Sequence, residues 1–206
     1  MNYERLLSYG NIIQLKHNLD CNKLLEEISG FEFGLYNPRK KNNPRYGLSI
    51  TSLDGSLNGI DLDSLIDAYE KTGQVYNEMS FRTLTEVYEK SSELKKVIDP
   101  LKNFLGRTHF LRFSKGGHFP PHRDDRGSQS QPDFRIIVPI KYTNPPDSYY
   151  VFNGEIVNLN YGYAYFMNTN LEHSFFSFNN ESTMIVMNVE GCSDAYQLVL
   201  DSMYST

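Results

Sequence analysis

A histidine, an aspartate and a distant second histidine are the residues of this sequence whose spacing most clearly allows chemistry. His122 and Asp124 stand two residues apart, and His173 follows 49 positions after the aspartate (173 − 124 = 49). Two imidazoles and one carboxylate are the ligand set of non-haem Fe(II) sites, which leave other metal positions open. Side chains two residues apart on a strand point the same way, so His122 and Asp124 can hold one ion together. His173 must then come from a strand that folds back beside them.

Other interpretations of these three residues stay open. Three nitrogen and oxygen ligands also suit a catalytic Zn²⁺, so the sequence does not exclude a hydrolase. The residues could equally form a structural zinc site or a hydrogen-bonded polar cluster. Asp125 could replace Asp124 in principle, but on a strand its side chain would face away from that of His122.

Short strands that follow one another after residue 106 would position these residues. Asn153-Gly154, between two apolar runs, predicts a type I′ hairpin turn. Many short strands separated by turn residues indicate an antiparallel sandwich or barrel. The expected strands are Thr108–Phe113, Phe134–Tyr142, Tyr149–Phe152, Glu155–Asn158, Ala164–Met167, Ser174–Phe178 and Thr183–Val189.

Helical patterns dominate before residue 106. The expected helices are Cys21–Ile28 with Asp20 as N-cap, Asp61–Tyr69, and Thr83–Leu105 with a break at Pro100. Strands are expected between them at Asn11–Gln14 and Tyr46–Ile50. We therefore predict a mainly β fold with N-terminal helices, built as one domain around a jelly roll of two sheets. Its helix-rich part covers 1–106, the jelly-roll core 107–191 and a C-terminal segment 192–206.

Composition narrows the function classes. A net charge of −5 argues against nucleic-acid binding, for which a basic surface is expected. Cys21 and Cys192 stand near opposite ends of the chain and form no disulfide framework, which favours a reducing cytoplasm. The sequence shows no signal peptide and no apolar run of about 18 residues, so we expect no membrane segment.

The stretch from Arg107 to Gly191 resembles a known enzyme superfamily. Its motifs, in order, are Phe113-Ser114-Lys115-Gly116-Gly117-His118-Phe119-Pro120-Pro121-His122-Arg123-Asp124, Arg135-Ile136-Ile137-Val138-Pro139-Ile140, Asn153-Gly154-Glu155, Tyr161-Gly162-Tyr163-Ala164-Tyr165-Phe166 and Leu171-Glu172-His173-Ser174. They resemble the Fe(II)- and 2-oxoglutarate-dependent oxygenases of double-stranded β-helix fold. The resemblance is greatest to the aspartyl/asparaginyl β-hydroxylase and free-proline hydroxylase branch.

The resemblance implies that His122, Asp124 and His173 bind Fe(II) and that 2-oxoglutarate is the cosubstrate. Two positions depart from the branch. A basic residue ten positions after the second histidine usually pairs with the far carboxylate of 2-oxoglutarate, but this chain has Thr183 there (173 + 10 = 183). A serine that helps to hold the same carboxylate falls on Leu111. These departures concern the cosubstrate and leave the metal site intact.

Arg135 is the predicted cofactor-binding residue. The branch carries an arginine at this position that contacts a carboxylate group, and a guanidinium can pair with a carboxylate through two hydrogen bonds. Arg135 could also form a surface salt bridge or a structural contact at the barrel rim. Lys141 lies six residues further along the same strand, where an exposed strand-end lysine is expected.

For several other residues a structural role is the simpler interpretation. His118 is expected near the mouth of the site without being a ligand, and one tyrosine phenol could bond a cosubstrate carboxylate. The basic loop 38–46 is expected to be a solvated turn, with a substrate-binding lid as the alternative. The residues concerned are His118, Arg112, Lys115, Arg123, Tyr161, Tyr163, Tyr165, the loop Pro38–Tyr46 and Cys192.

The function predicted from these observations is that of a non-haem Fe(II)- and 2-oxoglutarate-dependent dioxygenase. It would hydroxylate an amino acid or a peptide or protein side chain, with O₂ and a small-molecule or peptide substrate as partners. A jelly-roll binding module with a structural or lost metal is one alternative, and an iron oxidase that does not use 2-oxoglutarate is another. The missing cation after His173 favours these alternatives. The sequence fixes neither the substrate nor the oligomeric state.

Overall fold

The fold is built from two antiparallel sheets that face each other. The computed structural model describes residues 2–37, 42–59, 62, 65–124 and 132–204. The larger sheet contains, in spatial order, β1 (Ile12–Asn18), β11 (Tyr163–Met167), β8 (Phe134–Lys141), β13 (Ser182–Val189), β6 (Leu105–Phe113), β3 (Arg45–Ser49) and β2 (Gly34–Leu35). The smaller sheet contains β10 (Glu155–Val157), β9 (Ser148–Phe152), β12 (His173–Ser177) and β7 (His118–His122). A short pair, β4 (Thr51–Ser52) and β5 (Thr83–Leu84), forms a separate two-stranded sheet beside β6.

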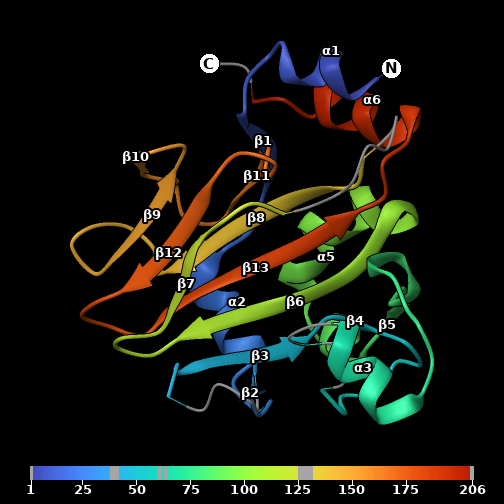
Figure 1. Ribbon diagram of the computed structural model, residues 1–206, viewed down its shortest axis with the longest axis vertical. Helices are drawn as coiled ribbons and strands as arrows, with labels where there is room; N and C mark the ends of the chain where they lie inside the picture. Colours follow the sequence, from blue (N-terminus) through green and yellow to red (C-terminus); the bar gives the residue numbers. More distant parts are fainter. Residues whose placement is uncertain (1, 38–41, 60–61, 63–64, 125–131, 205–206) are drawn as a thin grey trace.

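Helices cover the face of the larger sheet that is turned away from the smaller one. Figure 1 shows α2 and α5 behind the larger sheet, while α1 and α6 lie together near the two chain ends. The helices are α1 (Tyr3–Leu7), α2 (Cys21–Glu27), α3 (Leu65–Thr72), α4 (Glu86–Lys90), α5 (Ser92–Ile98) and α6 (Ser193–Asp201), with 3₁₀ turns η1 (Glu78–Ser80) and η2 (Asp99–Phe104). None of the helices within the described ranges is long and apolar enough to cross a membrane.

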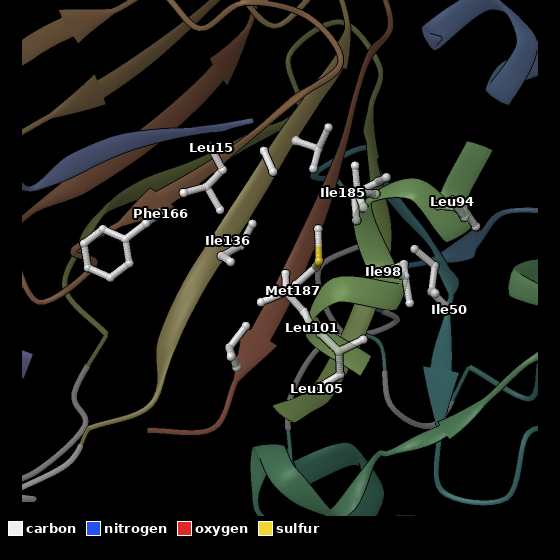
Figure 2. Packing of buried hydrophobic residues seen from close by; sticks show 14 of the residues in the cluster. Leu15, Ile50, Leu94, Ile98, Leu101, Leu105, Ile136, Phe166, Ile185 and Met187 are labelled. Carbon is white, nitrogen blue, oxygen red and sulfur yellow. The ribbon is translucent and has the colours of Figure 1, made fainter. Parts of the chain in front are cut away.

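Two apolar cores lie on opposite faces of the larger sheet. On β13, Ile185 and Met187 belong to the core under the helices, whereas Met184 and Val186 belong to the core between the two sheets. Figure 2 shows the helix-side core, where Ile98 of α5 and Leu101 of η2 lie over the sheet. Because side chains alternate along a strand, a strand covered on both faces has buried residues throughout. All eight residues of β13 are buried.

The fold class predicted from the sequence is confirmed: the chain is mainly β with a jelly roll of two sheets and few helices. The predicted strands after residue 106 are all present, with ends that shift by one to three residues. Asn153 and Gly154 have φ values of +50° and +84°, which fits the expected type I′ turn between β9 and β10. The division into parts 1–106, 107–191 and 192–206 stays a prediction, although β1, β2 and β3 from the first part complete the larger sheet.

The N-terminal predictions hold less closely. Asp20 caps α2 as expected by accepting from the N–H groups of Asn22 and Lys23. One or two helices were expected over Thr83–Leu105, with a break or a new first turn at Pro100. The segment contains β5, α4, α5 and η2, and Pro100 stands in the first turn of η2. Ser91 divides α4 from α5 by accepting from the N–H of Leu94, so it caps a new helix instead of continuing the old one. Of the helix predicted over Asp61–Tyr69, residues 61, 63 and 64 lie outside the described ranges, and α3 occupies the remainder.

Candidate metal centre

Strand pairing brings the two predicted histidine ligands together. His122 ends β7 and His173 begins β12, and the two residues are direct partners across this antiparallel pair. Their ring centroids are 4.2 Å apart. Asp124 lies two residues beyond β7, where its N–H donates to the Thr169 carbonyl at 2.9 Å. This hydrogen bond fixes the chain after the strand and turns Asp124 toward the histidines.

The three side chains form a group with the dimensions of a metal site. One ligand atom from each of His122, Asp124 and His173 lies within 4.8 Å of the other two. The separation of His122 Nε2 from Asp124 Oδ1 is 3.8 Å, which is too long for a hydrogen bond. A polar cluster held by its own hydrogen bonds would have a shorter separation here. The group therefore fits a divalent ion better than it fits a self-contained cluster.

Backbone carbonyls set the tautomer of both histidines. His122 Nδ1 lies 2.7 Å from the Pro120 carbonyl, and His173 Nδ1 lies 3.0 Å from the Leu171 carbonyl. A carbonyl oxygen can only accept, so in both rings Nδ1 carries the hydrogen. In the neutral ring Nε2 then has a free lone pair, which is the form that a metal requires. Burial lowers the pKa of His173 below its ordinary value and so favours this neutral form.

Arg135 holds the carboxylate of the third ligand. Its Nε donates to Asp124 Oδ2 at 2.8 Å, and both side chains are largely buried. A second pair lies behind it, in which Arg107 donates to Glu78 at 2.7 Å and 3.0 Å. Burial by itself would lower the pKa of Arg135, but Asp124 and Glu78 outweigh burial and raise that pKa. Burial likewise opposes ionisation of Glu78, yet Arg107 and Arg135 hold its pKa below the ordinary value.

A cavity of about 100 Å³ opens from this group into the space between the two sheets. Arg135 and all three candidate ligands line it. The other lining residues are mostly apolar: Tyr36, His109, Leu111, Phe113, Phe119, Ile137, Tyr150, Thr169, Ser174, Phe175, Met184 and Val186. A mainly apolar pocket beside a group that could bind a metal can hold a small organic ligand.

Of the two positions at which a cosubstrate anchor was expected, one lines the cavity and the other does not. Leu111 lies on the cavity wall, as its counterpart in the resembling branch requires. Thr183 is buried but does not line the cavity, and its neighbour Met184 takes the place on the wall. Side chains alternate along β13, so Met184 and Val186 face the cavity, while Thr183 has the parity of Ile185 and Met187, which belong to the core under the helices.

Most other polar residues weighed from the sequence have structural partners. Arg112 stacks over Phe33 and lies 3.3 Å from Glu181, and Lys141 stacks over Tyr142. Arg123 is exposed beside the candidate ligands, and Cys192 caps α6. His118 stacks on Phe176 and bonds the Gly116 carbonyl, and it lies outside the metal group, as expected. Lys115 lines a separate surface hollow with His118 and Phe176.

The tyrosine stripe contributes no phenol to the cavity lining in the described part of the chain. Tyr165 donates to Gln14 at 2.8 Å, Tyr163 contacts Tyr204, and Tyr161 is exposed. In the basic loop, residues 38–41 lie outside the described ranges. Arg45 is not part of a solvated turn, because it is 4% exposed and stacks on Phe119 and Tyr36.

Sequence reasoning missed two polar residues of the cavity, His109 and Tyr150. His109 stands on β6 and Tyr150 on β9, and both are buried. The available signal was the alternation of side chains along the strand. His109 has the same parity as Leu111 and Phe113, which belong to the core between the two sheets. That signal identifies an inward face but not the cavity that the face meets.

Comparison with known proteins gives a result at the level of the fold. Neither a known sequence family nor a curated protein sequence matches the chain. Among solved structures, HygX from Streptomyces hygroscopicus, determined with nickel and 2-oxoglutarate bound, is 8% identical with a TM-score of 0.55. The similarity covers 94% of this chain and 88% of HygX. A prolyl-4-hydroxylase from Pseudomonas putida is 10% identical with a TM-score of 0.50, over 91% of this chain and 96% of the hydroxylase.

Fold and site geometry together define a class. The chain has the double-stranded β-helix fold that oxygenases of the 2-oxoglutarate and Fe(II) type share with cupins. It also brings a His-Asp-His group that could hold a metal to the end of the cavity between the sheets. At these low identities the comparisons support the fold, and they do not select a branch within it.

Proposed function

We propose that this chain is a non-haem Fe(II)- and 2-oxoglutarate-dependent oxygenase that hydroxylates an amino acid or a peptide or protein side chain. One observation carries the proposal: two imidazoles whose Nδ1 atoms face backbone carbonyls and one carboxylate meet in a mainly apolar pocket between the two sheets. The fold shared with HygX, which was solved with nickel and 2-oxoglutarate bound, supports it.

His122, Asp124 and His173 would hold Fe(II), which supplies O₂ activation when bound. The overall reaction converts 2-oxoglutarate and O₂ to succinate and carbon dioxide, while the second oxygen atom enters a C–H bond of the substrate. The contribution of the chain is placement. The two backbone carbonyls fix the imidazoles, Arg135 fixes the Asp124 carboxylate, and Ile137 and Val186 help to keep the cavity dry.

Arg135 stays our predicted cosubstrate-binding residue. Its Nε donates a hydrogen bond to Asp124, so a hydrogen bond to 2-oxoglutarate would come from the Nη atoms. A guanidinium can serve two carboxylates in this way because its five N–H groups spread over a planar fork.

The test is an anaerobic titration of Fe(II)-loaded protein with 2-oxoglutarate, followed by the absorption change that accompanies chelation. We expect a saturable change with one equivalent of 2-oxoglutarate per chain, and succinate formation after O₂ is admitted. A protein that retains Fe(II) but gives neither signal would contradict the proposal.

A cosubstrate-free iron oxidase is the second candidate. Leu111 and Met184 favour it, because these apolar side chains stand on the cavity wall where the resembling branch holds a carboxylate. In that case O₂ would be consumed with the substrate alone and no succinate would form. Metal binding that is unaffected by 2-oxoglutarate, with no O₂ consumption by the Fe(II)-loaded protein, would instead favour a structural metal in a binding module.

A further inference from the structure

The cavity beyond the metal group holds two buried polar side chains that the fold leaves without hydrogen bonds. His109 is 1% exposed, and neither ring nitrogen has a hydrogen-bond partner within the described part of the chain. Tyr150 is 5% exposed, and among the same described residues its hydroxyl also has none. Both side chains line the cavity that the candidate metal ligands line. Buried polar groups are nearly always hydrogen-bonded, so two unsatisfied groups in one cavity point to a ligand that completes them.

Both groups are uncharged hydrogen-bonding groups. Burial, followed by the charges of Arg107 and Arg135, holds the pKa of His109 well below its ordinary value. Burial also raises the pKa of Tyr150 above its ordinary value. The imidazole therefore offers one N–H, and the phenol offers one O–H.

The two side chains lie one inward position beyond the metal group on their respective sheets. Tyr150 pairs with Phe175, which is two residues past His173 on β12. On the larger sheet His109 pairs with Val186, and Val186 pairs with Ile137, which is two residues past Arg135. Two residues of a strand span about 7 Å. A ligand that chelates the metal and carries a short chain along the cavity would place its far end between His109 and Tyr150.

We propose that His109 and Tyr150 together bind the far carboxylate of the metal-chelating 2-oxo acid. This inference rests on the proposed function and deepens it. A carboxylate accepts through both oxygens, so one oxygen can take the N–H of His109 and the other the O–H of Tyr150. Leu111 and Met184, on the same wall, offer no donor.

Two ligands with the same metal-chelating group can show how much the far carboxylate contributes to binding. 2-Oxoglutarate carries this carboxylate, whereas 2-oxobutanoate lacks it. Their dissociation constants would be measured by anaerobic calorimetry on Fe(II)-loaded wild type, Tyr150→Phe and His109→Phe. We expect each substitution to weaken 2-oxoglutarate binding by about tenfold or more and to leave 2-oxobutanoate binding unchanged, because a hydrogen bond to a charged group is lost.

Other results would overturn the proposal in recognisable ways. Unchanged 2-oxoglutarate affinity in both variants would exclude the pair, and loss in Arg45→Met alone would assign the carboxylate to the buried Arg45. Equal losses of affinity for 2-oxoglutarate and for 2-oxobutanoate would show that the substitutions disturb the cavity as a whole. If wild type bound neither ligand, the proposed function itself would fail and this inference with it.

A measurement without metal or ligand provides a second test. Because the Tyr150 hydroxyl has no hydrogen-bond partner among the described residues, Tyr150→Phe should unfold at the same temperature as wild type or higher. Tyr165→Phe is the matched control: Tyr165 is also 5% exposed, but its hydroxyl donates to Gln14 and accepts from the Asn160 N–H. We expect the control to unfold at a lower temperature. A decrease in Tyr150→Phe as large as in Tyr165→Phe would assign Tyr150 a structural role and contradict the proposal.

Discussion

The Asp124 carboxylate lies between the candidate metal site and Arg135. Its Oδ2 accepts from Arg135 Nε at 2.8 Å, while its Oδ1 lies 3.8 Å from His122 Nε2 and faces the ligand group. One oxygen is therefore held by Arg135, and the other faces the candidate ligand group. Arg135 comes from β8 of the larger sheet, so this contact links the two sheets at the metal end of the cavity.

Replacement of Arg135 should weaken metal binding as well as cosubstrate binding. Residues that orient a metal ligand typically contribute about 10–100-fold in affinity, and we expect Arg135→Ala to lose that much for Fe(II). We also expect Arg135→Ala, measured at saturating Fe(II), to bind 2-oxoglutarate about two orders of magnitude more weakly. Arg135→Lys should restore only part of either affinity, since an ammonium lacks the planar fork.

The two affinities of the Arg135 variants separate its two roles. Fe(II) affinity would be measured by competition with a chelator, and 2-oxoglutarate affinity by anaerobic titration. Weaker metal binding with unchanged 2-oxoglutarate binding would restrict Arg135 to the orientation of Asp124. Unchanged affinities for both would remove it from the site.

His122→Ala and His173→Ala should each abolish stoichiometric Fe(II) binding while the fold persists. Both side chains lie at strand ends beside the cavity, whereas the strands themselves are held by their ladders and the two cores. Metal content after gel filtration and far-ultraviolet circular dichroism would report the two properties. His118→Ala is the control, because His118 is on the same strand as His122 but outside the ligand group. A His122→Ala/His173→Ala double variant that keeps one Fe(II) per chain would show that the site is assigned wrongly.

Acid should destabilise the chain partly through Glu93. Hydrogen bonds from Lys96 and from the Asp20 N–H, with a further contribution from Lys23, lower the pKa of Glu93 from 4.5 to about 2. A group whose pKa is lowered on folding stabilises the fold above its unfolded pKa, and this stability disappears as pH falls toward the folded value. Its contribution is therefore complete above about pH 5 and decreases between pH 4.5 and pH 2.

Urea unfolding at pH 6 and pH 3 would measure the Glu93 contribution. We expect wild type to lose more free energy of unfolding over this interval than Glu93→Gln loses, because the variant has no carboxyl group to protonate at this position. Equal losses in the two proteins would show that other carboxyl groups account for the acid sensitivity.

Gly162 should tolerate a side chain less well than Gly154, although both have positive φ. The two angles are +81° and +84°. A Cβ at Gly162 would meet the Leu19 carbonyl oxygen, whereas a Cβ at Gly154 would meet nothing within 4 Å. Gly154→Ala should therefore cost only the strain of the left-handed conformation, about 1–2 kcal/mol, and Gly162→Ala should cost more. Chemical unfolding of both variants would check the order, and equal costs would show that the Leu19 segment moves away freely.

The amino-acid sequence by itself determined which residues are candidate metal ligands and which strands carry most of the fold. The alternation of apolar residues and the turn residues between them are local properties, and they predicted β8, β9, β11, β12 and β13 closely. The Asn153-Gly154 turn was predicted for the same reason, since two adjacent positive φ angles favour these residue types. The strand β7 was not among the expected strands, and the strand on which His122 and Asp124 were both expected ends at His122. It forms nevertheless as the edge strand of the smaller sheet. No strand of the described part of the chain pairs with its outer side, so the missing N–H of a proline costs no hydrogen bond there.

Tertiary structure alone decided which of these residues meet. The pairing of His122 with His173 and the contact of Arg135 with Asp124 depend on the order and register of strands far apart in the chain. Met184 and not Thr183 stands on the cavity wall, because the packing of β13 between the sheet and the helices decides which of its two faces meets the cavity. His109 and Tyr150 meet one cavity because β6 and β9 belong to opposing sheets. Local patterns fix which face of a strand is apolar, but the partner of that face is set by the packing of the whole chain.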